Sequence, residues 1–292
     1  MRDFRPLSTK PSAQRGLTLI EVLVSMALGV FFLGIAVQYL VVGQASNQVH
    51  DAGSRIQENA RFANNLLREA IRLSGYNGDA SVVAAPDFIF TGNCGGFNPC
   101  SRDGINPATN VGDSVAVSLV ADGDISQDCL GNGVDAGTLF ANVFWVQQDP
   151  VDQVTSLFCR GWDINGGPGG NGEWMSVAQP LVDGVQHMQV QYGLSNVANE
   201  DFFGPVVGFL SAAGVQALDG GSGDAWQFVR AVRVSLLVDS GLGTVESNFA
   251  GAVAYQADTR TYELLDGPSF DLSDGRLRRA YTFTVELNNS FE

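Results

Sequence analysis

The chain of 292 residues is poor in basic side chains: it contains one lysine, Lys10, and two histidines, His50 and His187, and its net charge is −15. Such a chain lacks the basic surface on which nucleic acid binds. It also lacks a Gly-x-Ser-x-Gly motif. His50 falls in a predicted helix, and we interpret His187 as a polar residue on a strand face and not as a general base. The sequence therefore argues against a nucleic-acid-binding protein and against a hydrolase.

A long apolar run from Leu17 to Val42 contains one charged residue, Glu21. As a helix, its 26 residues span about 39 Å, enough to cross a hydrocarbon core of about 30 Å with some tilt. Four basic residues and one acid precede the run, which predicts a cytoplasmic N-terminus. A carboxylate near the bilayer centre costs about 2.5–3.5 kcal/mol, so Glu21 indicates a partner that neutralises it.

Two other readings of this run are an anchor with an accidental acid and an uncut signal peptide. An ordinary signal peptide has a shorter apolar core of about 7–15 residues, and its cleavage site follows that core. In this chain the plausible cleavage site lies ahead of the apolar run, after Gly16. The order of the segments therefore favours neither alternative.

The N-terminal segment resembles the start of a type IV prepilin in the register of its small residue, apolar residue and acid, Arg15-Gly16-Leu17-Thr18-Leu19-Ile20-Glu21-Val22. The resemblance implies that prepilin peptidase cleaves a basic leader after Gly16 and that the new terminus at Leu17 is N-methylated. It also implies that Glu21 pairs with the Leu17 ammonium group of a neighbouring subunit and so fixes the axial register. Leu17 and Glu21 are one helical turn apart, so they lie on one face.

Cleavage would make the chain still more acidic. Removal of residues 1–16 takes away four basic residues and one acid, so the net charge of −15 becomes −18. The mature chain would contain no lysine, so it could form no lysine Schiff base and would carry no basic patch for nucleic acid. The acidic surplus fits a soluble surface outside the cytoplasm.

The predicted helix continues beyond the membrane segment, because no proline occurs between Gln44 and Ser74. Apolar or small residues recur there at steps of three and four, the period of a helix with one buried face. These residues are Val49, Ala52, Ile56, Ala60, Ala63, Leu67, Ala70 and Ser74. We expect Phe62, Leu66 and Leu73 to widen this stripe and Gly75 to close the helix as its C′ residue.

The rest of the chain alternates between apolar and polar residues in short runs separated by loops. This period of two, with one polar face, is typical of antiparallel strands that are covered on one side. The clearest runs are Val115–Leu119, Met188–Tyr192, Val232–Val238 and Tyr281–Leu287. We predict an α+β fold in which a long N-terminal helix, transmembrane in its first half, packs through its second half on a C-terminal antiparallel β-sheet domain. The expected parts are a leader, residues 1–16, a helix, 17–75, with its transmembrane segment at 17–42, and a β-rich domain outside the cytoplasm, 76–292.

The four cysteines are predicted to form disulfides, because this topology places them in an oxidising compartment. No Cys-x-x-Cys spacing occurs and both histidines are distant in sequence, which argues against a metal site. Four cysteines allow three pairings. We favour Cys94 with Cys100, which closes a short loop, and Cys129 with Cys159, which joins two strand regions; the other pairings stay open.

Three stretches of the C-terminal half resemble the PilW-type minor pilins of type IV pili. They are Leu181–Val185 leading into Met188–Gly193, Val229–Leu237, and Arg278–Leu287. Two further stretches, Asp128–Gly131 and Leu157–Arg160, also resemble the family and support a Cys129–Cys159 pair. The J-type minor pseudopilins of type II secretion systems share the architecture and the final arginine pair, and they are the alternative.

The PilW-type resemblance implies a minor pilin that helps to initiate type IV pilus assembly, sits at or near the filament tip, and has no catalytic chemistry. Its implied partners are prepilin peptidase, other minor pilins, the major pilin and a tip adhesin, and its implied roles are twitching motility and cell adhesion. We expect the chain in the inner membrane as a single-pass protein with a periplasmic domain, and then outside the cell in the pilus.

One acidic stretch has the spacing of a calcium loop at its start, in Asp122, Asp124, Ser126 and Asp128. It lacks the glycine and the glutamate that such a loop has at its sixth and twelfth positions, where Gln127 and Gly133 stand. We interpret the stretch as a solvated acidic turn and expect no cofactor, with calcium as the alternative.

Overall fold

A computed structural model describes residues 16, 18–77, 87–104, 112–149, 154–197, 204–218, 224–241, 260–262, 264–265, 270–272 and 276–287. The chain divides into two compact units, Met1–Asn47 and Gln48–Glu292. The first holds the apolar half of a long helix. The second holds the other half of that helix together with the strands.

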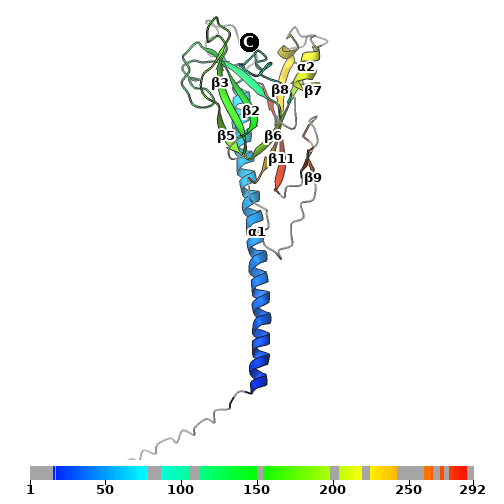
Figure 1. The fold of residues 1–292 in the computed structure, drawn as a ribbon. Helices are drawn as coiled ribbons and strands as arrows, with labels where there is room; N and C mark the ends of the chain where they lie inside the picture. Colours follow the sequence, from blue (N-terminus) through cyan, green and yellow to red (C-terminus); the bar gives the residue numbers. More distant parts are fainter. Residues whose placement is uncertain are drawn as a thin grey trace, which may run out of the picture. The chain divides into compact units, whose positions relative to one another are not determined.

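Helix α1 is continuous from Leu19 to Leu73 (Figure 1). Thr18 caps its start, because the Glu21 N–H donates to the Thr18 carbonyl oxygen at 3.1 Å and also approaches the Thr18 hydroxyl at 3.4 Å. Gly75 follows its end with a φ of 75°, the left-handed conformation of a C′ glycine. The Gly75 N–H then donates to the Ser118 carbonyl oxygen at 2.8 Å, so the end of α1 is attached to a strand.

The first antiparallel sheet follows the order β1-β2-β3-β4, and β5 also pairs with β3. Its strands are β1 (Val115–Val120), β2 (Leu139–Gln148), β3 (Thr155–Asp163), β4 (Glu173–Trp174) and β5 (Gln179–Asp183). β1 and most of β2 are buried on both faces. Val117 and Phe144 belong to the core that contains α1, whereas Ala116 and Trp145 belong to a second apolar cluster with Cys94 and Cys100.

The second antiparallel sheet follows the order β11-β8-β6-β7. Its strands are β6 (Val185–Leu194), β7 (Gly208–Leu210), β8 (Val229–Asp239) and β11 (Arg278–Glu286). The remaining elements are α2 (Ala212–Leu218), the 3-10 helix η2 (Asp224–Phe228), and the pair β9 (Arg260–Tyr262) and β10 (Phe270–Leu272). The α+β architecture predicted from the sequence is confirmed, with all strand pairs of the two sheets antiparallel among the described residues.

The second half of α1 supplies one stripe of the main core. Ala52, Ile56, Ala60, Ala63, Leu67 and Ile71 are each at most 2% exposed. The expectation that Phe62 and Leu73 widen this stripe was wrong: they are 55% and 37% exposed. Both lie about a quarter turn or more away from the line through Leu67, at the edge of the buried face or outside it. Leu66 does pack against the main core, as expected. Ile71 is fully buried in the stripe, although the sequence analysis did not include it there.

The polar face of β6 is not a solvent face. His187 and Gln189 are 3% and 7% exposed, and the His187 Nε2 lies 2.9 Å from the Gln189 Nε2. The opposite face of the strand carries Met188, Val190 and Tyr192 into the main core. Burial raises the pKa of the Tyr192 phenol. Alternation predicted which residues share a face of β6, but not that both faces are covered.

A sharp turn at Asp183 and Gly184 carries the chain from β5 in the first sheet to β6 in the second. The Asn59 side-chain amide of α1 donates to the Asp183 carbonyl oxygen at 2.9 Å. The Gly184 N–H donates to the Thr155 carbonyl oxygen at 2.9 Å, and its carbonyl oxygen accepts the Asp239 N–H at 2.8 Å. This turn therefore contacts α1, β3 and β8, and it ties both sheets to the helix.

Replacing Gly184 by alanine is expected to lower the free energy of unfolding by about 1–3 kcal/mol. Gly184 has a φ of 79°, and a methyl group there would lie 3.0 Å from the Asp239 carbonyl oxygen. Gly208→Ala is the matched control, because nothing lies within 4 Å of the position its methyl group would take. Urea unfolding of both variants checks the prediction, and equal midpoints would contradict it.

Candidate functional site

The N-terminal end of α1 is the first candidate site. Gly16, Thr18 and Glu21 are exposed, while Leu17 lies outside the described residues. Glu21 stands in the first turn of the helix, directly after the Thr18 cap. The geometry thus leaves the Glu21 carboxylate on the surface of the helix, where another chain can reach it. Its pairing with Leu17 of a neighbour stays a prediction.

The first half of α1 is long and apolar enough to cross a membrane by length and composition. Every residue from Leu19 to Leu40 is exposed in the chain on its own. A surface this apolar and this long is not stable in water, so it requires lipid or other protein around it. This half of the helix is therefore the second candidate site, a surface that another molecule must cover.

Two disulfides hold the loops of the first sheet, and they join the two pairs that we favoured from the sequence. Cys94 bonds to Cys100 across a Cα–Cα distance of 5.6 Å, and Cys129 bonds to Cys159 across 6.4 Å. The Cys94–Cys100 loop lies over the outer face of the first sheet, where the Phe97 ring centre is 5.0 Å from that of Trp145. The Trp174 indole N–H donates to the Gly95 carbonyl oxygen at 3.3 Å. The Cys94–Cys100 bond and the Trp174 hydrogen bond therefore hold this loop against the first sheet.

A buried polar cluster joins three strands at one end of the second sheet. The Gln186 amide donates to the Asp239 Oδ2 at 2.7 Å, and the Arg278 Nε donates to the Gln186 Oε1. The Arg276 Nη1 forms an ion pair with the Asp239 Oδ2 at 3.1 Å. Asp239 and Arg278 are only 3% and 8% exposed, so each must be paired. Sequence reasoning missed this cluster, although Arg278 had been noted as part of the final arginine pair.

In the acidic stretch after β1, the carboxylates of Asp122 and Asp128 accept hydrogen bonds from nearby backbone N–H groups. The Asp122 Oδ1 accepts the N–H groups of Asp124 and Ile125 at 2.8 and 2.7 Å, and its Oδ2 accepts the Tyr76 hydroxyl at 2.8 Å. The N–H of Ile125 and the Tyr76 hydroxyl, in that order of effect, lower the pKa of Asp122. Asp128 likewise accepts the N–H groups of Leu130 and Asn132. In the part of the chain that the structure describes, no group of three or more candidate ligands could hold a metal ion.

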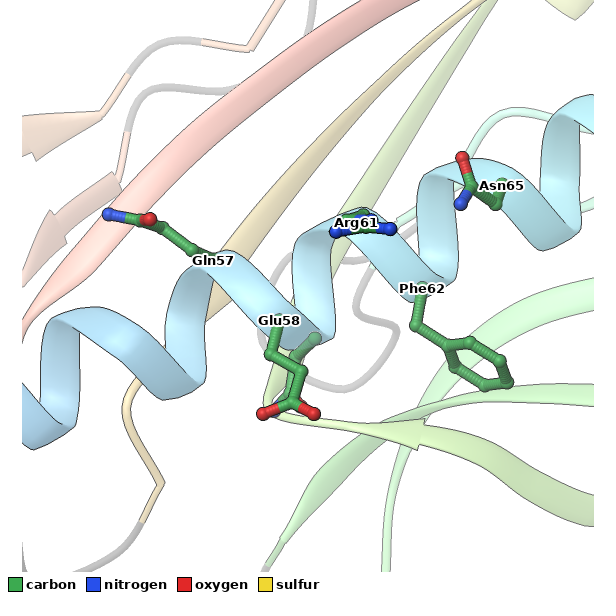
Figure 2. Close-up of a pocket in the computed structure, with 6 residues that line it drawn as sticks. Gln57, Glu58, Arg61, Phe62 and Asn65 are labelled. Carbon is green, nitrogen blue, oxygen red and sulfur yellow. The ribbon is translucent and has the colours of Figure 1, made fainter.

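A hollow along α1 offers no catalytic set among its described residues. Figure 2 shows Gln57, Glu58, Arg61, Phe62 and Asn65 projecting from successive turns of the helix. One carboxylate and one guanidinium stand beside amides and an aromatic ring, with neither a nucleophile nor a histidine. General acid–base or nucleophilic chemistry needs such groups in hydrogen-bonding contact. The described lining of this hollow therefore supplies no such pair of groups.

Two protein-family models match the segments of the chain that carry these features. Residues 143–289, just over half of the chain, match the family model described as Type IV Pilus-assembly protein W. The chain belongs to the PilW family. In this PilW-family chain, residues 11–37 also match the prokaryotic N-terminal methylation motif, which implies processing by prepilin peptidase and contact with other pilus components. The apolar start of α1 fits a membrane-anchored pilin.

The PilW match begins within β2 and ends just beyond β11, so it includes the buried polar cluster. Among solved structures, the PilW-family chain is similar to a type IV-like pilin from Thermus thermophilus at 16% identity. That likeness covers 80% of this chain and 96% of the other, with a TM-score of 0.39. No curated protein gave a match.

Loss of the Cys129–Cys159 bond is expected to destabilise the PilW-family chain more than loss of the Cys94–Cys100 bond. The two bonds span 30 and 6 residues. Loop-closure entropy then predicts a difference of about 1.4 kcal/mol between the paired cysteine-to-alanine variants. Urea unfolding without reductant measures the difference, and peptide mapping of the parent chain without reductant is expected to find no free thiol. A larger loss from the Cys94–Cys100 variant, or a Cys94–Cys129 link, would contradict this account.

Proposed function

We propose that this PilW-family chain is a minor pilin that helps to initiate type IV pilus assembly and sits at or near the filament tip. The observation that carries the proposal is the presence, in one chain, of an N-terminal methylation motif on an exposed apolar helix and a C-terminal PilW domain. The motif supports processing and membrane insertion. The domain supports a place among the proteins that assemble the pilus.

In this proposal, the precursor sits in the inner membrane with residues 1–16 in the cytoplasm and residues 76–292 in the periplasm. Prepilin peptidase cleaves after Gly16, and Leu17 is N-methylated. The subunit then joins other minor pilins, the major pilin and a tip adhesin outside the cell. In this proposal it acts by contact alone, without catalysis or a cofactor, and the hydrogen bonds that the Asp122 and Asp128 carboxylates accept from backbone N–H groups support a structural role for the calcium-like stretch.

Deletion of the gene tests the proposal when surface pili, twitching and protein secretion are scored separately. We expect few or no pili and no twitching, with secretion unchanged. Expression of the wild-type chain from a second locus should restore both pili and twitching. Loss of secretion with pili intact would replace the proposal by a role as a J-type pseudopilin, and normal pili with normal secretion would refute both roles.

Replacing Gly16 by phenylalanine is expected to leave an uncut precursor, because the cleavage site then carries a bulky side chain. Gly16→Ala is the matched control, since a small residue should still be cleaved. Mass spectrometry of the purified chain separates the two results: the control should begin at Leu17, and the phenylalanine variant should retain residues 1–16. A mature chain that begins at any other residue would overturn the assignment of the site.

A further inference from the structure

A groove lined by both apolar and polar side chains runs between α1 and the first sheet. It has a volume of about 290 Å³ and is open to solvent, since Leu73 at its rim is 37% exposed. The residues that carry the argument are taken together as the α1–β2 groove: Leu66, Glu69 and Leu73 of α1, Ile125 and Asp128 of the loop after β1, and Phe144 of β2. Its apolar residues favour contact with an apolar stem, and its polar residues favour a polar or charged end on the same occupant.

The groove continues along one flank of α1. Counting from Glu58, steps of four, four, three and four residues reach Phe62, Leu66, Glu69 and Leu73, so these five residues form one line on the helix. Figure 2 shows the side chains of Glu58 and Phe62 on the same side of α1. Phe62 is 55% exposed. This flank therefore carries both acidic and apolar side chains over about 22 Å.

The charge of the groove has one sign. Its described lining includes the carboxylates of Glu69 and Asp128 and no basic residue. Asp128 already accepts hydrogen bonds from Leu130 and Asn132, whereas Glu69 is exposed and has no bonded partner among the described residues. An occupant that complements this surface carries an apolar stem and a positive head. Lysine and arginine are the side chains with that shape.

We propose that the α1–β2 groove receives a lysine or arginine side chain on a helix of a neighbouring pilin subunit, with apolar residues of that helix on Phe62 and Leu73. The proposal rests on the proposed function, because it takes the neighbour from pilus assembly. The methylene stem lies between Leu66, Leu73 and Ile125, and the positive head pairs with Glu69. Because the mature chain contains no lysine, a lysine in this groove comes from another chain.

Photocrosslinking in piliated cells tests the groove directly. A benzophenone amino acid replaces Leu73 in the full-length chain, and mass spectrometry identifies the linked peptide. We expect a peptide of another pilin that carries lysine or arginine within about one helical turn of the linked residue. The same replacement at Val177, which is 77% exposed and outside the groove, is the control and should give no such link.

Charge variants then test the role of Glu69 in the presence of the Leu73 crosslinker. Glu69→Arg is expected to reduce the yield of that link at least fivefold, and Glu69→Asp to retain most of it. Disulfide formation, read on a gel without reductant, confirms that both variants fold. A yield unchanged by Glu69→Arg would overturn the proposal, as would links only to lipid, to a second copy of this chain, or to a peptide without a basic residue.

The two proposals fail separately. If deletion of the gene abolishes pili but the crosslinker at Leu73 gives no link to a pilin, the groove proposal is wrong and the minor pilin proposal stands. If deletion leaves pili intact, the proposed function is wrong, and a link from Leu73 to a pseudopilin would identify the assembly to which the groove belongs.

Discussion

Replacing Glu21 by alanine is expected to leave the chain in the membrane but outside the filament. Removal of a carboxylate from the apolar run does not oppose insertion, because a charge in a membrane segment is unfavourable. In the predicted pairing, the same change would leave the Leu17 ammonium group of a neighbour without its partner. Loss of one member of a buried ion pair costs about 3–5 kcal/mol. Incorporation into pili should therefore fall about 100-fold or more.

Immunoblots of sheared pili and of membrane fractions measure incorporation and insertion separately. Gln38→Ala is the matched control, because it also exchanges a polar residue for alanine in the same apolar helix. It should insert and assemble like the parent chain. Normal incorporation of Glu21→Ala would refute the pairing and would leave membership of the PilW family untouched.

Replacing Leu67 by alanine is expected to reduce the free energy of unfolding by about 2–5 kcal/mol. Leu67 is fully buried in the main core, where it stands between Ala63 and Ile71 on the inner stripe of α1. The change removes apolar contacts and leaves a cavity, because helix and sheets are held together by hydrogen bonds at Asn59 and Gly75 and collapse little. A loss of this size is a large share of the typical 5–15 kcal/mol of a folded domain.

Urea unfolding of the full-length chain in detergent, followed by tryptophan fluorescence, measures the effect. Leu218→Ala is the matched control, since Leu218 is 54% exposed on α2 and should shift the midpoint little. Equal shifts for the two variants would show that α1 is not packed on the sheets as described. A cleavable α1 in limited proteolysis of the unchanged chain would point the same way.

Periodicity in the sequence predicted the parts of the fold that depend on local pattern. The alternation at Val232–Val238 marked β8, and the helical spacing from Ala52 to Leu67 marked the buried stripe of α1. Each of these patterns records which side chains share a face. That information is contained in neighbouring residues, so it can be read without knowing the rest of the chain.

The same patterns did not show what covers each face. Phe62 and Leu73 look as apolar as Leu67 in the sequence, yet both are exposed. Gln189 looks like a solvent residue, yet it is buried beside His187. The cluster of Gln186, Asp239 and Arg278 depends on strands 53 and 92 residues apart in sequence, and no local signal connects them. Contacts of this range are set by packing and not by pattern.

The position of β11 has a consequence for the order in which the domain folds. β11 is the last strand among the described residues, yet it pairs along β8 and contacts α1, where Arg68 lies over the Phe283 ring at 4.7 Å and donates to the Thr284 carbonyl oxygen across 216 residues. Because a chain is made from its N-terminus, α1 is complete long before residues 278–286 are added, and until then it lacks β11. Such long-range closure is slow. A stop codon ahead of Arg278 should therefore leave the domain open to proteases, which pulse-chase labelling would show as rapid loss of the truncated chain.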